Sequence, residues 1–277
     1  MGRQHVTSAD TPVGKQADAV REDHRGRRVR VSTRRAVSVI ALSLTAAVLL
    51  AFGVVKGWTE PLDQWGFAWI RALGPAGAAN APLWVRETVR DVTAIGGAFP
   101  LTVAVIASAA YLAVSGRQRL GWLLGSSATV ATLANMLLKA SFARLRPELE
   151  GQLVYVYNAS FPSGHALLST TIILMLGGLL SVAAPGQRQK LVILGTAAAL
   201  CAAIGLSRIW LGVHWPTDVL AGWLIGTAWA GATLLAAQRI TPLADRRASA
   251  ITAAGVATVT KGDAAAMAGH RPAPNAR

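Results

Sequence analysis

The sequence predicts an all-α, polytopic membrane protein, a helical bundle with about six transmembrane helices. Its composition is the first reason: 53% of the 277 residues are hydrophobic and only 14% are charged, with a mean hydropathy of +0.42. Soluble globular proteins average about 45–50% apolar and about 25% charged residues. The second reason is that the apolar residues gather in long stretches rather than in one alternating pattern. Both observations favour helices buried in a bilayer.

Six stretches are long and apolar enough to span a bilayer, which takes about 20 residues. They run approximately from Ala36 to Val55, Val92 to Val114, Leu120 to Leu138, His165 to Ala184, Leu191 to Gly205 and Val219 to Ala237. The fifth reaches full length only if its helix continues through Ser207 and Arg208, which would place an arginine at the membrane edge. Between the first two stretches, a segment rich in Trp, Gly and Pro predicts a short interfacial helix near Trp65 to Leu73.

Two polar tails flank the apolar region. Residues 1–35 are strongly basic, and residues 241–277 are rich in Ala with Pro and Gly. Neither tail carries enough apolar surface to form a core. We therefore expect both tails to be disordered and cytoplasmic, and residues 36–240 to form one six-helix membrane domain.

The first apolar stretch also resembles a targeting segment. Arg34 and Arg35 before an apolar run resemble a twin-arginine export signal. A cleaved signal would carry a small-residue site after its apolar region, but residues Phe52 to Trp58 contain no Ala-x-Ala. We favour a retained helix.

Basic residues in the short loops predict the orientation. The loop after the second stretch contains Arg117 and Arg119, and the loop after the fourth contains Arg188 and Lys190. Cytoplasmic loops carry an excess of Lys and Arg. This places both termini in the cytoplasm of a multi-pass protein of the cell membrane, and it leaves the loops after the third and fifth stretches outside.

The net charge of +14 could indicate nucleic acid as a partner. However, many of the basic residues lie in the first 35 positions, directly before an apolar stretch, and not on one folded face. We therefore expect the lipid bilayer, and no nucleic acid, as a partner. Cys201 is the only cysteine, so no internal disulfide can form, and we expect it to be an inert packing residue.

Three polar clusters lie beside helix ends on the predicted outer side. The first runs from Lys139 to Arg146-Pro147, the second is Pro162-Ser163-Gly164-His165, and the third runs from Ser207-Arg208 to His214 and Asp218. Charged groups at membrane depth are costly, so they indicate a function or a partner.

The clusters contain what a phosphate ester requires. Lys139, Arg146 and Arg208 supply three cations, and arginine suits bidentate recognition of oxygens. Ser163 can cap the following helix, and Gly164 allows a phosphate to approach the backbone. The free N–H groups of that first turn then point at the anion.

The third cluster suggests a nucleophile and its orienting carboxylate. Pro216 suits the first turn of the sixth helix, where Asp218 is also favoured. From there Asp218 can accept a hydrogen bond from one ring nitrogen of His214 and leave the other free to attack. His165 then remains for proton donation.

Together the clusters resemble the type 2 phosphatidic acid phosphatase superfamily. The family pattern is Lys, six residues, Arg-Pro; then Pro-Ser-Gly-His; then Ser-Arg, five residues, His, three residues, Asp, and every fixed position is matched. The resemblance covers about Leu120 to Ala237. It implies a phosphohistidine intermediate on His214, protonation of the leaving group by His165, and neither metal nor cofactor. It also implies that the phosphoryl group is held by Lys139, Arg146, Arg208, Ser163 and the Gly164 backbone.

Other polar residues receive simpler interpretations. We interpret Arg144, which lies off the pattern, as an interfacial anchor that reaches toward lipid head groups. Asn135 is expected to make an interhelical hydrogen bond. Gly222 and Gly226 form a small-xxx-small pair that fits packing within the chain as well as dimerisation, so the oligomeric state stays open.

The predicted function is a membrane phosphatase for a lipid phosphate or lipid pyrophosphate. Because the site faces outward, we lean slightly toward a polyprenyl pyrophosphate over phosphatidic acid or phosphatidylglycerol phosphate. A lipid phosphotransferase with the same intermediate is the close alternative. A vanadate-dependent haloperoxidase has a similar constellation but is soluble. From another class, a transporter would show discontinuous helices and charges within the spans.

Overall fold

The computed structural model describes residues 32–73, 78, 80–147 and 159–240, so the two predicted disordered tails lie almost entirely outside the described residues. In the described part all regular secondary structure is helical, which confirms the all-α class. The helices are α2 (Thr33–Val55), α3 (Glu60–Ala72), α4 (Leu83–Ile95), α5 (Ala98–Val114), α6 (Gln118–Phe142), α7 (Gly164–Ala183), α8 (Gln187–Trp210) and a last helix, Pro216–Ile240.

Five of these helices are long and apolar enough to cross a membrane, and the bent pair α4 and α5 makes a sixth span if it is counted as one. The prediction of about six spans is therefore confirmed. The fifth predicted stretch continues through Arg208 as α8, which gives it the full length that the shorter apolar run lacked.

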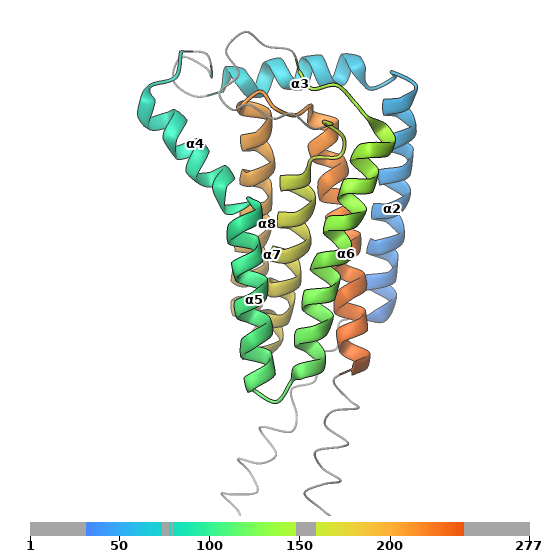
Figure 1. The fold of residues 1–277 in the computed structure, drawn as a ribbon, viewed down its shortest axis with the longest axis vertical. Helices are drawn as coiled ribbons and strands as arrows, with labels where there is room; N and C mark the ends of the chain where they lie inside the picture. Colours follow the sequence, from blue (N-terminus) through green and yellow to red (C-terminus); the bar gives the residue numbers. More distant parts are fainter. Residues whose placement is uncertain (1–31, 74–77, 79, 148–158, 241–277) are drawn as a thin grey trace, which may run out of the picture.

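The prediction of one continuous second span from Val92 to Val114 is wrong. The chain bends by 40° between α4 and α5, at Gly96 and Gly97. A Cβ at Gly96 would lie 2.4 Å from the side chain of Ile204, so only glycine allows α4 to approach α8 this closely. Adjacent glycines are also a common cause of sharp helix bends. The bend aims α4 away from the bundle, as Figure 1 shows.

The predicted interfacial helix is present as α3, which lies across one end of the bundle (Figure 1). Its buried positions Asp63, Gly66, Phe67 and Ile70 follow the spacing of one helix face. Trp65 and Trp69 stack on the opposite, exposed face, where indole rings suit a membrane interface.

The same end of the bundle carries the end of α6 and the starts of α7 and of the last helix (Figure 1). The opposite end carries the start of α2, the α5–α6 connection and the α7–α8 connection. The loops with basic residues thus lie opposite the three polar clusters.

Two glycines of the last helix bring it close to α7. A Cβ at Gly222 would lie 2.9 Å from the Ser163 carbonyl oxygen, and one at Gly226 would lie 2.7 Å from that of Leu167. The small-xxx-small pair therefore packs within the chain. Because this contact joins the start of α7 to the start of the last helix, it fixes the second and third clusters relative to each other.

We expect Gly226→Val to lower the midpoint of thermal unfolding in detergent. The added side chain meets backbone that cannot rotate away, and overpacking of this kind costs about 1–3 kcal/mol. Gly195→Val is the matched control, because a Cβ at Gly195 has no atom within 4 Å. Equal midpoints for the two variants would contradict the packing described here.

Candidate active site

The second cluster forms the start of α7. Ser163 is its N-cap, and its side chain accepts a hydrogen bond from the Ala166 N–H at 3.5 Å, which confirms the predicted cap. The Ser163 N–H donates to the backbone oxygen of Asp218 at 3.0 Å. The first turn of α7 is therefore tied directly to the first turn of the last helix.

The first cluster leaves α6 as an extended strap. Ala143 adopts a left-handed conformation with φ of 44°, and its N–H caps the Lys139 carbonyl. Alternate residues of an extended chain face the same side. Arg144 and Arg146 accordingly point toward the protein, while Leu145 is 79% exposed.

Lys139 and Arg146 converge on one acceptor. The Lys139 ammonium donates to the Ala159 carbonyl at 2.6 Å, and Arg146 Nη2 approaches the same oxygen at 3.3 Å. These two cations from the first cluster therefore lie side by side at the end of α6.

Arg146 also reaches the third cluster. Its Nη1 donates to the Val213 carbonyl and lies 3.3 Å from Nε2 of His214. Because a guanidinium can only donate, Nε2 is the unprotonated ring nitrogen in this contact. The proton of a neutral ring is then on Nδ1.

Nδ1 of His214 faces the predicted carboxylate. It lies 3.5 Å from Oδ2 of Asp218, which is longer than a well-formed hydrogen bond. Such contacts often shorten when a substrate binds. Nδ1 is buried and makes no hydrogen bond among the described residues, so the predicted bond from the ring to Asp218 stays a prediction.

Burial controls the charge of His214, whose side chain is almost completely enclosed. Desolvation lowers the pKa of His214 to about 4, although Asp218 acts in the opposite direction. The ring is therefore neutral near pH 7 and its Nε2 lone pair is available for attack on phosphorus.

Arg208 approaches from α8. It is 4% exposed, and its Nη1 donates to the Thr93 hydroxyl of α4 at 3.0 Å. Its buried Nε has no hydrogen-bond partner among the described residues. A buried guanidinium with an unused donor is suited to an anionic ligand.

His165 and Gly164 open α7 beside Lys139. A Cβ at Gly164 would lie 3.1 Å from Nδ2 of Asn135 and 3.6 Å from Cε of Lys139. The half-buried His165 is the next residue of this first turn. The structure thus brings together all eight residues predicted for the site: Lys139, Arg146, Ser163, Gly164, His165, Arg208, His214 and Asp218.

The prediction for Asn135 is wrong. It makes no hydrogen bond to another helix in the described structure, and its buried Oδ1 has no partner there. Its amide instead packs against the backbone of Gly164, at the N-terminal turn of α7.

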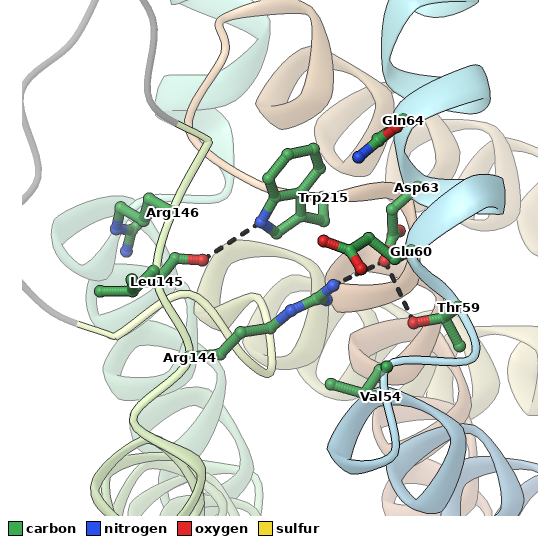
Figure 2. A pocket seen from close by; sticks show the side chains of 10 residues that line it. Val54, Thr59, Glu60, Asp63, Gln64, Arg144, Leu145, Arg146 and Trp215 are labelled. Carbon is green, nitrogen blue, oxygen red and sulfur yellow. Dashed lines mark hydrogen bonds and ion pairs between the residues drawn. The ribbon is translucent and has the colours of Figure 1, made fainter.

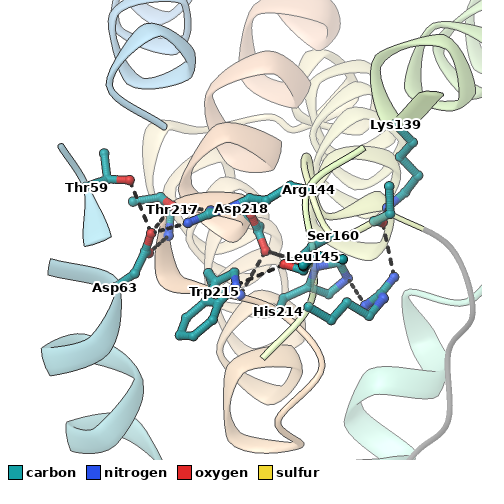
Figure 3. Close-up of polar contacts among 12 residues, drawn as sticks. Thr59, Asp63, Lys139, Arg144, Leu145, Ser160, His214, Trp215, Thr217 and Asp218 are labelled. Carbon is teal, nitrogen blue, oxygen red and sulfur yellow. Dashed lines mark hydrogen bonds and ion pairs between the residues drawn. The ribbon is translucent and has the colours of Figure 1, made fainter. Parts of the chain in front are cut away.

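The interpretation of Arg144 as an interfacial anchor is also wrong. Its Nη1 donates to Oδ1 of Asp218 at 2.7 Å, and its Nη2 donates to Oδ2 of Asp63 at 2.6 Å (Figure 3). Both carboxylates are buried, and they attract the guanidinium inward more strongly than lipid head groups can at the surface. The sequence did contain a signal for this contact. Asp63 is spaced with the apolar residues of α3, and a carboxylate on a buried helix face needs a cation as its partner.

A cavity of about 330 Å³ adjoins Arg144 and Arg146 (Figure 2). It lies between α3 and the strap, and its lining includes Glu60, Gln64 and Trp215. A second, apolar cavity of about 200 Å³ lies between α3, α4 and α8 and includes Val92 and Ser207.

No cluster of three or more His, Cys, Asp or Glu residues that could hold a metal occurs in the described ranges. The expectation of a metal-free, cofactor-free site remains a prediction.

Comparisons with known proteins identify similar sequences. Residues 120–242 match the model of the PAP2 superfamily. The chain is 28% identical over 145 residues to phosphatidylglycerophosphatase B of Bacillus subtilis, a match that covers 52% of this chain and 70% of that protein. It is 32% identical over 115 residues to undecaprenyl-diphosphatase of Sulfolobus acidocaldarius, covering 40% of this chain and 52% of the relative.

The fold has a solved counterpart. The crystal structure of a transmembrane PAP2-type phosphatidylglycerolphosphate phosphatase from Bacillus subtilis aligns with a TM-score of 0.55 at 24% identity. The alignment covers 72% of this chain and 93% of that one.

Proposed function

We propose that this chain, whose residues 120–242 match the PAP2 superfamily model, hydrolyses a lipid phosphate or polyprenyl pyrophosphate through a phosphohistidine on His214. The observation that carries the proposal is the convergence of the three clusters. Lys139 and Arg146 both donate to the Ala159 carbonyl oxygen, and Nη1 of Arg146 lies 3.3 Å from Nε2 of His214.

In the first step, Nε2 of His214 attacks phosphorus and the bond from phosphorus to the leaving oxygen breaks. The bound phosphate dianion favours the protonated form of His165, which gives its proton to that oxygen, so the lipid alcohol or lipid monophosphate leaves with this proton. Arg146 exchanges its contact with Nε2 for a phosphoryl oxygen. Lys139, Arg208 and the N–H groups at the start of α7 stabilise the negative charge that the transition state spreads over the oxygens.

In the second step, water attacks the phosphohistidine while His165 takes up one of its protons. The phosphorus–nitrogen bond breaks and its electron pair returns to Nε2, which frees inorganic phosphate and restores both histidines. Asp218 stabilises the positive charge that His214 carries while it is phosphorylated.

The two cavities do not decide the substrate, because neither is lined by Lys139, His165, Arg208 or His214. The name of the Sulfolobus relative and the outward orientation favour a polyprenyl pyrophosphate among the candidate substrates.

We further propose that the site faces outward and that both termini are cytoplasmic. The single cysteine, Cys201, is buried, so the chain offers a clean background for labelling. In whole cells, a membrane-impermeant maleimide is expected to label Leu145→Cys on the strap, but to label Ser115→Cys in the α5–α6 connection only after the cells are opened. The reverse pattern would contradict the orientation.

A transporter is less well supported. The break between α4 and α5 is the kind of discontinuity that a transporter would show. However, Thr93, which lies just before this break, accepts a hydrogen bond from Arg208 of the proposed phosphate site, and the three polar clusters lie at the same end of the bundle.

The proposed function is tested by phosphate release from the purified protein in detergent. The substrate panel contains undecaprenyl pyrophosphate, phosphatidylglycerol phosphate and phosphatidic acid, each with EDTA and without an added acceptor. Release of inorganic phosphate that EDTA does not reduce is the expected result. Release only when a lipid or sugar alcohol is added would identify a phosphotransferase, and no turnover with any substrate would contradict the proposal.

A further inference from the structure

We propose that Arg144 is a positioning residue that holds Asp218 in register with His214, and that Asp63 anchors it from α3. This inference rests on the proposed function, because it assigns a task to residues that act on the nucleophile without touching the substrate.

The contacts form a chain from α3 to the nucleophile, as Figure 3 shows. Asp63 accepts Nη2 of Arg144 at 2.6 Å, and Nη1 of Arg144 donates to Oδ1 of Asp218 at 2.7 Å. The other oxygen of Asp218, Oδ2, is the one that faces Nδ1 of His214 at 3.5 Å. Arg144 therefore occupies one carboxylate oxygen and leaves the other directed at the histidine.

Further bonds fix both carboxylates. Oδ2 of Asp218 accepts hydrogen bonds from the backbone N–H of Trp215 at 2.8 Å and from the Ser160 hydroxyl. Asp63 accepts the N–H of Thr217 at 2.9 Å and its hydroxyl at 2.8 Å, which caps the start of the last helix. The side chain of Arg144 also lies over the Trp215 ring, 5.8 Å from its centroid.

The charges require this arginine. Asp63 and Asp218 are 1% and 0% exposed, and one guanidinium contacts both of them. Without Arg144, two buried carboxylates would lack their common cation, and Oδ1 of Asp218 would lose its charged partner, so that only the bonds to Oδ2 would orient this side chain. A misplacement of about 1 Å in a catalytic constellation can reduce the rate about 100-fold.

A double-mutant cycle tests the proposal. Arg144→Gln alone is expected to lower kcat about 100-fold and to change KM less than about threefold, since Arg144 does not bind the phosphoryl group. In the Asp218→Asn background the same substitution is expected to cost little more, because residues that act through one another are not additive. Additive losses in kcat would overturn the proposal.

Asp63→Asn separates positioning from a purely structural role. The amide retains its oxygen for Thr217 and leaves the contact of Arg144 with Asp218 in place, so we expect a lower unfolding midpoint but less than about a tenfold loss in kcat. Leu145→Ala, next to Arg144 on the exposed face of the strap, controls for disturbance of the strap. If the Arg144 and Asp63 variants lost kcat to the same extent and thermal stability to the same extent, Arg144 would have a purely structural role.

Thermal unfolding of the four proteins in the double-mutant cycle provides a readout without turnover. Arg144→Gln is expected to lower the unfolding midpoint by a larger shift in the wild-type background than in the Asp218→Asn background. If the wild-type protein released no phosphate, the proposed function would fail while this coupling could still be measured. If the wild type released phosphate but the two positions were uncoupled in both readouts, only the proposal for Arg144 would fail.

Discussion

His214→Ala is expected to reduce phosphate release by about 10⁴-fold or more, because the variant loses the atom that attacks phosphorus. Neutral His214 directs Nε2 toward Arg146 at 3.3 Å, whereas His165 lies in the first turn of α7. No other side chain of the three clusters is an equally placed nucleophile. The loss is measured as initial rate of phosphate release from the preferred lipid substrate.

Two controls separate lost chemistry from lost folding. His24→Ala removes a histidine that lies outside all three clusters and should leave the rate unchanged. Size-exclusion elution and membrane insertion of His214→Ala should match the wild type. A folded His214→Ala variant that retained a tenth of the wild-type rate would remove His214 as the nucleophile.

Asp218→Asn has the second largest expected effect, a loss in kcat of about 10³- to 10⁴-fold with KM almost unchanged. An amide cannot balance the positive charge on phosphorylated His214, and it no longer selects the ring tautomer with a proton on Nδ1. Saturation kinetics on one lipid substrate separate kcat from KM.

Asp63→Asn is the matched comparison, since it changes the other carboxylate that Arg144 contacts but not the one that faces His214. A smaller loss for Asp63→Asn than for Asp218→Asn is expected. If Asp218→Asn raised KM and left kcat intact, Asp218 would bind substrate rather than orient the histidine.

Much of the fold could be predicted because a bilayer leaves few options. Every backbone polar group must be satisfied within the segment, so long apolar runs become helices. That argument gave the spans, and the Trp-rich composition of the first outer segment indicated the interfacial helix α3. The role of Ser163 as an N-cap could also be predicted, because serine is a favoured residue immediately before a helix.

The errors share one cause, which is contact between segments distant in sequence. The bend at Gly96 depends on Ile204 of α8, and the inward turn of Arg144 depends on Asp63, 81 residues away. Asn135 packs against Gly164 instead of bonding across helices. The periodicity of a sequence predicts which side chains share one face of a helix, but it does not predict which distant segment packs against that face.

The account depends on one phosphoryl group being held by all three clusters against Nε2 of His214. A crystal structure of the protein with vanadate, which imitates five-coordinate phosphorus, tests this most directly. We expect vanadium bonded to Nε2 of His214, with its oxygens contacted by Lys139, Arg146 and Arg208. Vanadate bonded to His165, or bound at a place that those three cations do not reach, would contradict the proposed mechanism.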